Sequence, residues 1–143
     1  MLKRMLIVVL SCVLFIPSVS LSEELSASDR KMLEKAGIPP YPEAVLYGRV
    51  ESMTTGTITF SFATSDNLEK VRDWYKEKLS GWGVTEYFGS FGIYRGKEGL
   101  EWMEAMVNDN VVIDEDKNMH QWYEQLKPNM TTLVKITLMG DVQ

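Results

Sequence analysis

The residues best suited to chemistry lie in one acidic stretch. Asp114, Asp116 and Asn118 alternate along it, and oxygen ligands at that spacing begin many calcium-binding loops. The pattern then departs from an EF-hand, because Met119 stands at the sixth position instead of glycine and Gln125 at the twelfth instead of a bidentate glutamate. These residues allow a weak calcium site of another kind, and a solvated acidic loop is the alternative.

His120 is the only histidine, and it offers few routes to a metal centre. Zinc sites ordinarily combine several histidines and cysteines, whereas the single cysteine, Cys12, is distant in sequence. Met103, Met106 and Met119 could supply the soft thioether ligands that suit copper(I). Methionine also fills irregular cores, which is the simpler interpretation, so we predict no cofactor.

No recognisable catalytic group is present. Residues 89–92 (Gly-Ser-Phe-Gly) lack the spacing of a G-x-S-x-G nucleophile elbow, and no glycine-rich phosphate-binding motif occurs. Glu101 and Glu104 differ in parity, so on a regular strand they would point to opposite faces. We therefore predict that the protein is not an enzyme. A hydrolase using Glu104 or Asp116 as its base is the least favoured alternative.

Aromatic and soft side chains form two candidate binding groups. The first follows the acidic stretch and would contact a protein partner; it comprises Met119, His120, Trp122 and Tyr123. The second would line a pocket between a helix and a sheet, as in a small-ligand or metal carrier; it comprises Trp74, Tyr75 and Trp102. Packing in the core is the competing interpretation of the second group, because aromatic residues dominate core burial.

The elements that position these groups begin with a helix over residues 67–79. Asp66 and Glu69 have the spacing of a capping box, and Gly81 suits a left-handed C-terminal cap with Trp82 folding back on the last turn. The helix carries apolar residues at spacings of three and four, which places them on one face. They are Leu68, Val71, Tyr75 and Leu79.

The remaining patterns predict strands and short helices. A short helix capped by Ser28 ends at Gly37, and prolines follow it. Ile58, Phe60 and Phe62 alternate with smaller, mostly polar residues, as in a half-buried strand. The predicted strands cover residues 44–53, 57–63, 84–88, 91–95, 100–107, 111–113 and 131–139. Residues 119–126 have helical spacing that predicts a helical turn or two before Pro128.

We expect an α+β fold with an antiparallel sheet of about five or six strands and one main helix packed on one face. The expected order is β-β-α-β-β-β-(short α)-β. Residues 23–143 would form a single domain, in which residues 23–40 supply the N-terminal helix and a proline-rich connection.

Residues 1–22 are typical of a secretory signal peptide. Lys3 and Arg4 precede an apolar stretch over residues 5–16, Pro17 breaks it, and small residues follow at the expected cleavage site. The protein would then be periplasmic or secreted, with no membrane span after leader removal. The alternative is a lipoprotein anchored at Cys12, since residues 9–12 are a poor version of a bacterial lipobox.

The net charge and the cysteine content limit the classes of partner and covalent bond that the protein can have. Loss of the leader would shift the formal net charge from −5 to about −7. An acidic domain without a basic run is a poor candidate for binding nucleic acid or anionic lipid surfaces. Without Cys12 there is no disulfide. The sequence leaves open the oligomeric state, including whether free sheet edges pair in a dimer.

Part of the chain resembles a loose class of small exported bacterial domains. The motifs that carry the resemblance are Tyr-Pro-Glu-Ala at residues 41–44, a hairpin, Val71-x-x-Trp74-Tyr75-x-x-x-Leu79 and the following Gly-Trp pair. The resemblance covers residues 39–95 and implies a fold, not an activity, so it supplies no functional residues. Together with the leader it favours a non-catalytic envelope module that binds a protein or envelope component. The alternative is the small-ligand or metal carrier.

Overall fold

Alternating apolar residues form β2 (Ile58–Thr64), an inner strand of the sheet that is paired on both sides. The computed structural model describes residues 24–140, so the predicted leader and Cys12 lie outside the described residues. The other strands are β1 (Val45–Glu51), β3 (Gly83–Tyr87), β4 (Ser90–Tyr94), β5 (Asn110–Glu115) and β6 (Thr132–Leu138). The helices are α1 (Ala27–Ala36), α2 (Leu68–Lys78), the short α3 (Trp102–Ala105) and a 3₁₀ turn, η1 (Met119–Gln121).

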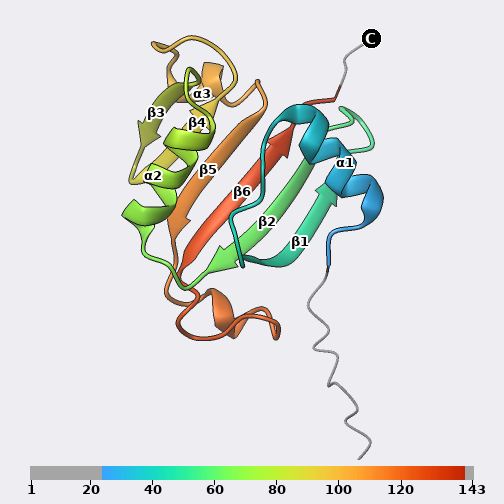
Figure 1. Cartoon of the computed structure of the whole chain (residues 1–143), viewed down its shortest axis with the longest axis vertical. Coiled ribbons are helices and arrows are strands. Elements are labelled where there is room, and N and C mark those ends of the chain that lie inside the picture. Colours follow the sequence, from blue (N-terminus) through green and yellow to red (C-terminus); the bar gives the residue numbers. More distant parts are fainter. Residues whose placement is uncertain (1–23, 141–143) are drawn as a thin grey trace, which may run out of the picture.

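The strands form one antiparallel sheet in the order β1-β2-β6-β5-β4-β3 (Figure 1). The last strand, β6, enters between β2 and β5, and β1 and β3 are the two edges. The predicted α+β class and the six-stranded antiparallel sheet are confirmed.

The main core lies between one face of the sheet and helices α1 and α2, which cover that face (Figure 1). The predicted stripe of α2 lies in it, with Val71 and Tyr75 fully buried. Phe60 and Ile136, paired neighbours on β2 and β6, form the opposite side. The helix and strand periodicities thus converge on one apolar layer.

The second face of the sheet is more open. At one end, the segment over residues 116–131 packs on Tyr47, Ala63 and Leu133 in a small apolar cluster. At the other side, α3 lies over Gly92 of β4. Between them, polar side chains such as Ser61 and Lys135 remain partly or fully exposed, as is common for the outer face of an antiparallel sheet.

One predicted strand differs from the structure. Residues 100–107 are not a strand, because β5 already takes the place beside β4 and the connection between them turns through α3. Within residues 119–126, the helical turn is the single 3₁₀ turn η1.

Both predicted helix caps shift by one or two residues. Asn67, not Asp66, caps α2, because its Oδ1 accepts from the Lys70 N–H at 2.9 Å. Asp66 instead accepts from the Tyr41 hydroxyl and pairs with the Lys70 ammonium. Ser26, not Ser28, caps α1 by accepting from the Asp29 N–H at 3.0 Å.

Within residues 24–140, the helices are all too short or too polar to cross a bilayer.

Candidate binding groove beside helix α1

The group predicted to line a pocket, Trp74, Tyr75 and Trp102, divides between the two faces of the sheet. Trp74 and Tyr75 lie on α2 with ring centroids 4.8 Å apart, and the Tyr41 ring meets Trp74 edge-on at 5.2 Å. Tyr75 is fully buried, and its hydroxyl donates to the Pro39 carbonyl at 3.0 Å. Burial raises the pKa of Tyr75. The Trp74 and Tyr75 rings are therefore part of the core packing, and neither lines the cavities described below.

Trp102 lies on the opposite face. Gly92 alternates with Phe91 and Ile93, which belong to the main core, so its missing side chain would point away from the helices. A Cβ on Gly92 would come within 3.0 Å of the Trp102 ring. Trp102 also stacks on Tyr87 with ring centroids 5.8 Å apart. The three residues predicted to line one pocket are therefore not brought together.

The group predicted to contact a protein partner covers one end of the sheet's open face. Met119 and Tyr123 pack against the Tyr47–Leu133 cluster, and the Tyr47 and Tyr123 rings lie 4.7 Å apart. His120 is half-buried, whereas Trp122 is 77 % exposed. Met119 and Tyr123 therefore pack against the sheet. Its role as a partner surface stays a prediction that rests on Trp122.

The acidic residues do not converge on a metal site. Asp116 Oδ1 accepts from the Asn118 N–H at 2.8 Å in a local turn, and Asp114 lies on β5. Among residues 24–140, no group of three or more histidine, cysteine, aspartate or glutamate side chains is arranged to hold a metal ion. Glu104 of α3 and Asp116 belong to different elements.

Tyr47 carries an unpartnered polar atom. Its side chain is buried, and its hydroxyl has no hydrogen-bond partner among the described residues, because the Ser61 hydroxyl nearby does not meet hydrogen-bond geometry. Burial, with Tyr123 and two acidic residues nearby, raises the pKa of Tyr47 to about 12. The raised pKa means that folding favours the neutral phenol over the phenolate.

Tyr47→Phe should leave the free energy of unfolding at neutral pH unchanged or raise it by up to about 1 kcal/mol, because no hydrogen bond is lost. The folded-state pKa of about 12 exceeds the ordinary value of 10.0. The stability due to Tyr47 is therefore full below pH 10 and lost as pH rises from 10 toward 12. Urea unfolding across this range should show the variant losing less stability than the wild type.

Tyr41→Phe is the matched control, since it removes the same atom from a hydroxyl that donates to Asp66 Oδ2 at 2.6 Å. It should lower stability at neutral pH by about 1 kcal/mol. If Tyr47→Phe and Tyr41→Phe lowered the free energy of unfolding by the same amount, the Tyr47 hydroxyl could not be unpartnered.

A groove that the sequence did not predict runs between α1 and the proline-rich segment after it. Gly37 ends α1 in the left-handed conformation (φ 72°) and turns the chain back along the helix, where Pro39 and Pro40 keep it extended. The cavity between the helix and this segment has a volume of about 460 Å³, and its apolar lining includes Leu33 and Ile38. That volume lies within the range of small-molecule and peptide sites.

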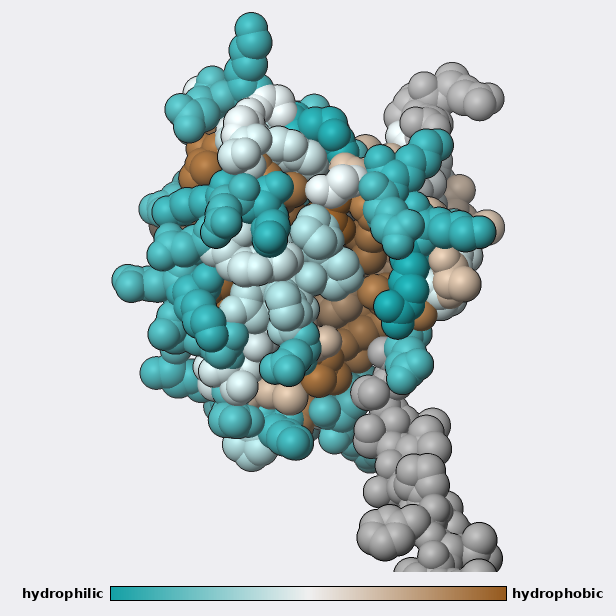
Figure 2. All heavy atoms as spheres, in the orientation of Figure 1, coloured by the Kyte–Doolittle hydropathy of each residue, from teal (hydrophilic) through white to brown (hydrophobic). Residues whose placement is uncertain are grey.

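A second cavity of about 370 Å³ continues the first along the start of β1. The two share Leu25, Arg30 and Pro40, and the second reaches Leu46 and Phe62 of the sheet. Figure 2 shows the result as a band of hydrophobic surface between α1 and the segment that leads to β1. We call the two cavities together the α1 groove.

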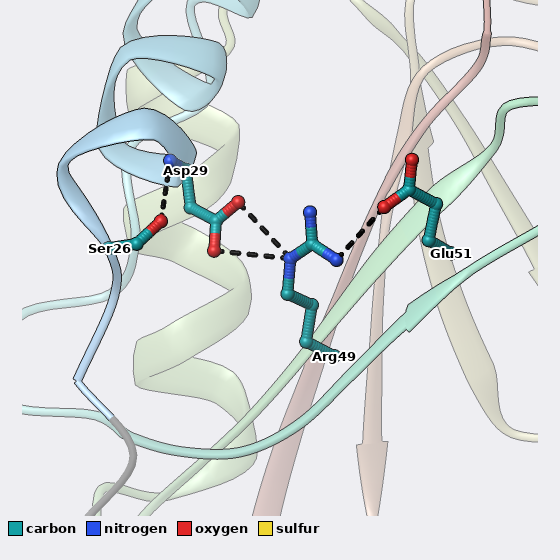
Figure 3. Close-up of polar contacts among 4 residues, drawn as sticks. All are labelled: Ser26, Asp29, Arg49 and Glu51. Atoms are coloured by element: carbon teal, nitrogen blue, oxygen red, sulfur yellow. Dashed lines mark hydrogen bonds and ion pairs between the residues drawn. The ribbon is translucent and has the colours of Figure 1, made fainter.

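Helix α1 is held in place by polar contacts at both ends. Near its N-terminus, Arg49 Nε donates to both carboxylate oxygens of the buried Asp29 at 3.1 Å, and Arg49 Nη1 donates to Glu51 at 3.1 Å (Figure 3). The Arg49 guanidinium also lies 5.8 Å from the Phe60 ring centroid. At the C-terminal end, Arg95 donates to the Ala36 carbonyl. The groove wall is therefore fixed to the sheet.

The rim of the groove is mainly acidic. Glu34 lines the first cavity, Glu24 and Glu43 line the second, and Arg30 is the single cation. The Arg30 side chain donates to the Leu25 carbonyl at 3.3 Å and makes no ion pair within residues 24–140. An apolar floor with this rim suits a ligand that is apolar along its length and carries positive charge.

One local signal for the groove was present in the sequence. The left-handed Gly37 followed by two prolines predicts a sharp reversal after the first helix. The reversal alone does not reveal a groove, because its depth depends on where α1 docks. The docking contact, Arg49 to Asp29, joins residues 20 positions apart in sequence.

A scan against protein-family models and searches of curated proteins and of solved structures found no match to this chain. The site is therefore interpreted from its own geometry.

Proposed function

We propose that the protein is a non-catalytic binding module that takes an extended peptide segment of a partner in the α1 groove. The observation that carries the proposal is the pair of adjoining cavities beside α1, which share lining residues and have an apolar floor. Apolar clefts with a few polar groups at the rim are common binding sites of small domains.

The shape of the groove favours an extended chain over a compact metabolite. A compact ligand would fill one cavity and leave the other, whereas an extended segment would lie along both. Its apolar side chains would contact the partly exposed Pro39 and Pro40 in one cavity and Ala44 and Val45 in the other. The buried Leu33 and Phe62 lie beneath them. The acidic rim selects for lysine or arginine in the same segment.

The proposed setting is the cell envelope. Its support is the leader-like sequence of residues 1–22. The mature protein would be free after cleavage, or anchored through Cys12 in the lipoprotein alternative.

Selection of peptides from a random phage-displayed library on the purified protein tests the proposal. Selected peptides should combine apolar residues with lysine or arginine, and they should bind in the micromolar range by calorimetry. Leu25→Asp, which puts a charge at the junction of the two cavities, should weaken binding at least about tenfold.

Met53→Asp is the matched control, because Met53 is 94 % exposed and lies in the β1–β2 connection away from the groove lining. It should bind the selected peptides like the wild type. Failure to select any peptide, or equal binding by Leu25→Asp and wild type, would contradict the proposal.

A further inference from the structure

The two edges of the sheet differ. The register of β1 against β2 shifts between Leu46 and Gly48, and such irregularities protect an edge from pairing with another chain. In β3, all five residues pair with β4 in unbroken register, from Gly83–Tyr94 to Tyr87–Ser90. Edge β3 is therefore regular and suited to accept a further strand.

The turn after β3 determines which backbone groups face outward. Tyr87 and Ser90 flank a two-residue turn, so they form a hydrogen-bonded pair, and the amide of Thr85 also points toward β4. The Gly83 N–H points the same way and donates to the Gly96 carbonyl just beyond β4 at 3.0 Å. The N–H and C=O groups of Val84 and Glu86 then point away from the sheet. Among the described residues no hydrogen bond to these outward groups is found.

Phe88 occupies a conformation that its side chain disfavours. Phe88 (φ 47°) and Gly89 (φ 86°) both have positive φ, as in a type I′ turn, where asparagine and glycine are preferred. Phe88 is 93 % exposed, and its ring meets only the Tyr87 ring, at 4.5 Å, among the aromatic side chains described. Strain of this kind persists mainly where a residue has a function.

An exposed apolar patch adjoins this edge. We call it the β3–α3 patch, and its members are Tyr87, Phe88, Trp102, Met103 and Val107. Phe88, Met103 and Val107 are each at least 70 % exposed, and the Tyr87–Trp102 stack joins the hairpin to α3. Exposed apolar patches of this kind mark interaction surfaces.

We propose that edge β3 and the β3–α3 patch pair with a second copy of this chain in a two-fold symmetric dimer. An antiparallel pair centred on Thr85 sets Val84 opposite the partner's Glu86, so the outward backbone groups of both strands are satisfied. Since α3 packs against β3, the same symmetry brings the two patches together on the open face.

Charge complementarity supports a second copy as the partner. Glu86 pairs with Phe91, a main-core residue, so its side chain lies on the helix-covered face. Within residues 24–140 it makes no ion pair. Opposite the partner's Val84, Glu86 lies on the sheet face that the partner's α2 covers. The cations of α2 nearest to β3 are Arg72 and Lys76, which lie 5.0 and 5.3 Å from the Phe91 ring centroid.

Sedimentation equilibrium of the purified protein over a micromolar range of concentrations tests this inference. The wild type should show a mass twice that of one chain. Glu86→Pro removes one outward N–H without removing a bond to β4 and should yield monomers. Phe88→Asn should raise the dissociation constant at least about tenfold, while its monomer unfolds at a higher temperature than the wild-type monomer, because asparagine suits the turn.

Val50→Asn is the control, since Val50 is 68 % exposed but lies on the other edge strand. It should remain dimeric. Circular dichroism would confirm that each variant is folded. A monomeric wild type, or a dimer that persists unchanged in both Glu86→Pro and Phe88→Asn, would overturn the inference. The result is independent of peptide binding in the α1 groove.

Discussion

Tyr75→Ala should lower the free energy of unfolding by about 3–5 kcal/mol, a large part of the stability of a domain this size. The side chain is fully buried between α2 and the sheet, and it supports the Tyr41 and Trp74 rings. Its removal leaves a cavity that the surrounding rings can fill only in part. Urea denaturation with a two-state fit would measure the loss.

Tyr75→Phe separates ring packing from the hydrogen bond. It keeps the ring and leaves the Pro39 carbonyl without its donor, so it should cost about 1 kcal/mol. If Tyr75→Ala lost no more stability than Tyr75→Phe, the Tyr75 ring would not contribute to the core. That result would favour the alternative prediction, in which Tyr75 lines a ligand pocket.

Asp29→Ala should lower the free energy of unfolding by about 1–3 kcal/mol and loosen α1. Asp29 is buried, and its loss would leave the Arg49 guanidinium with Glu51 as its only carboxylate partner. Loss of one partner of a fully buried pair costs more, but Arg49 is one-third exposed and water screens it. Hydrogen exchange should report faster opening of residues 27–36.

The double variant Asp29→Ala with Arg49→Gln is the control for this pair. It should be more stable than the sum of the two single losses predicts, with a coupling energy of about 0.5–3 kcal/mol. Peptide affinity for the α1 groove should fall in Asp29→Ala, because the wall formed by α1 is no longer fixed. Additive losses, or unchanged exchange of α1, would contradict the role of the pair in positioning the helix.

Local patterns in the sequence predicted most of the elements. The alternation of Ile58, Phe60 and Phe62 gave β2 its buried face, and the apolar spacing of α2 predicted its buried stripe. Gly37 caps α1 with positive φ, as predicted. Gly81 also has positive φ, but the C-terminal cap of α2 is Leu79, two residues earlier. These features depend on neighbours within a few residues, which a sequence displays directly.

Features that depend on distant contacts were not predictable in the same way. β6 lies between β2 and β5, so it pairs with a strand, β2, that is more than 60 residues earlier in the sequence. Trp102 was assigned to the wrong face because residues 100–107 alternate too imperfectly to reveal the turn of α3. The α1 groove depends on the docking of α1 through Asp29 and Arg49, whose sequence spacing has no regular pattern.

Chemical-shift mapping of backbone amides, with a peptide selected from the library titrated into the labelled protein, tests the central claim most directly. We predict that the largest changes fall on residues 24–46 and on Phe62, with the β3–α3 patch and residues 116–131 nearly unchanged. Changes centred on Trp122 and Tyr123 would favour the partner surface that the sequence predicted. Changes spread beyond residues 24–46 and Phe62 would contradict the α1 groove as the binding site.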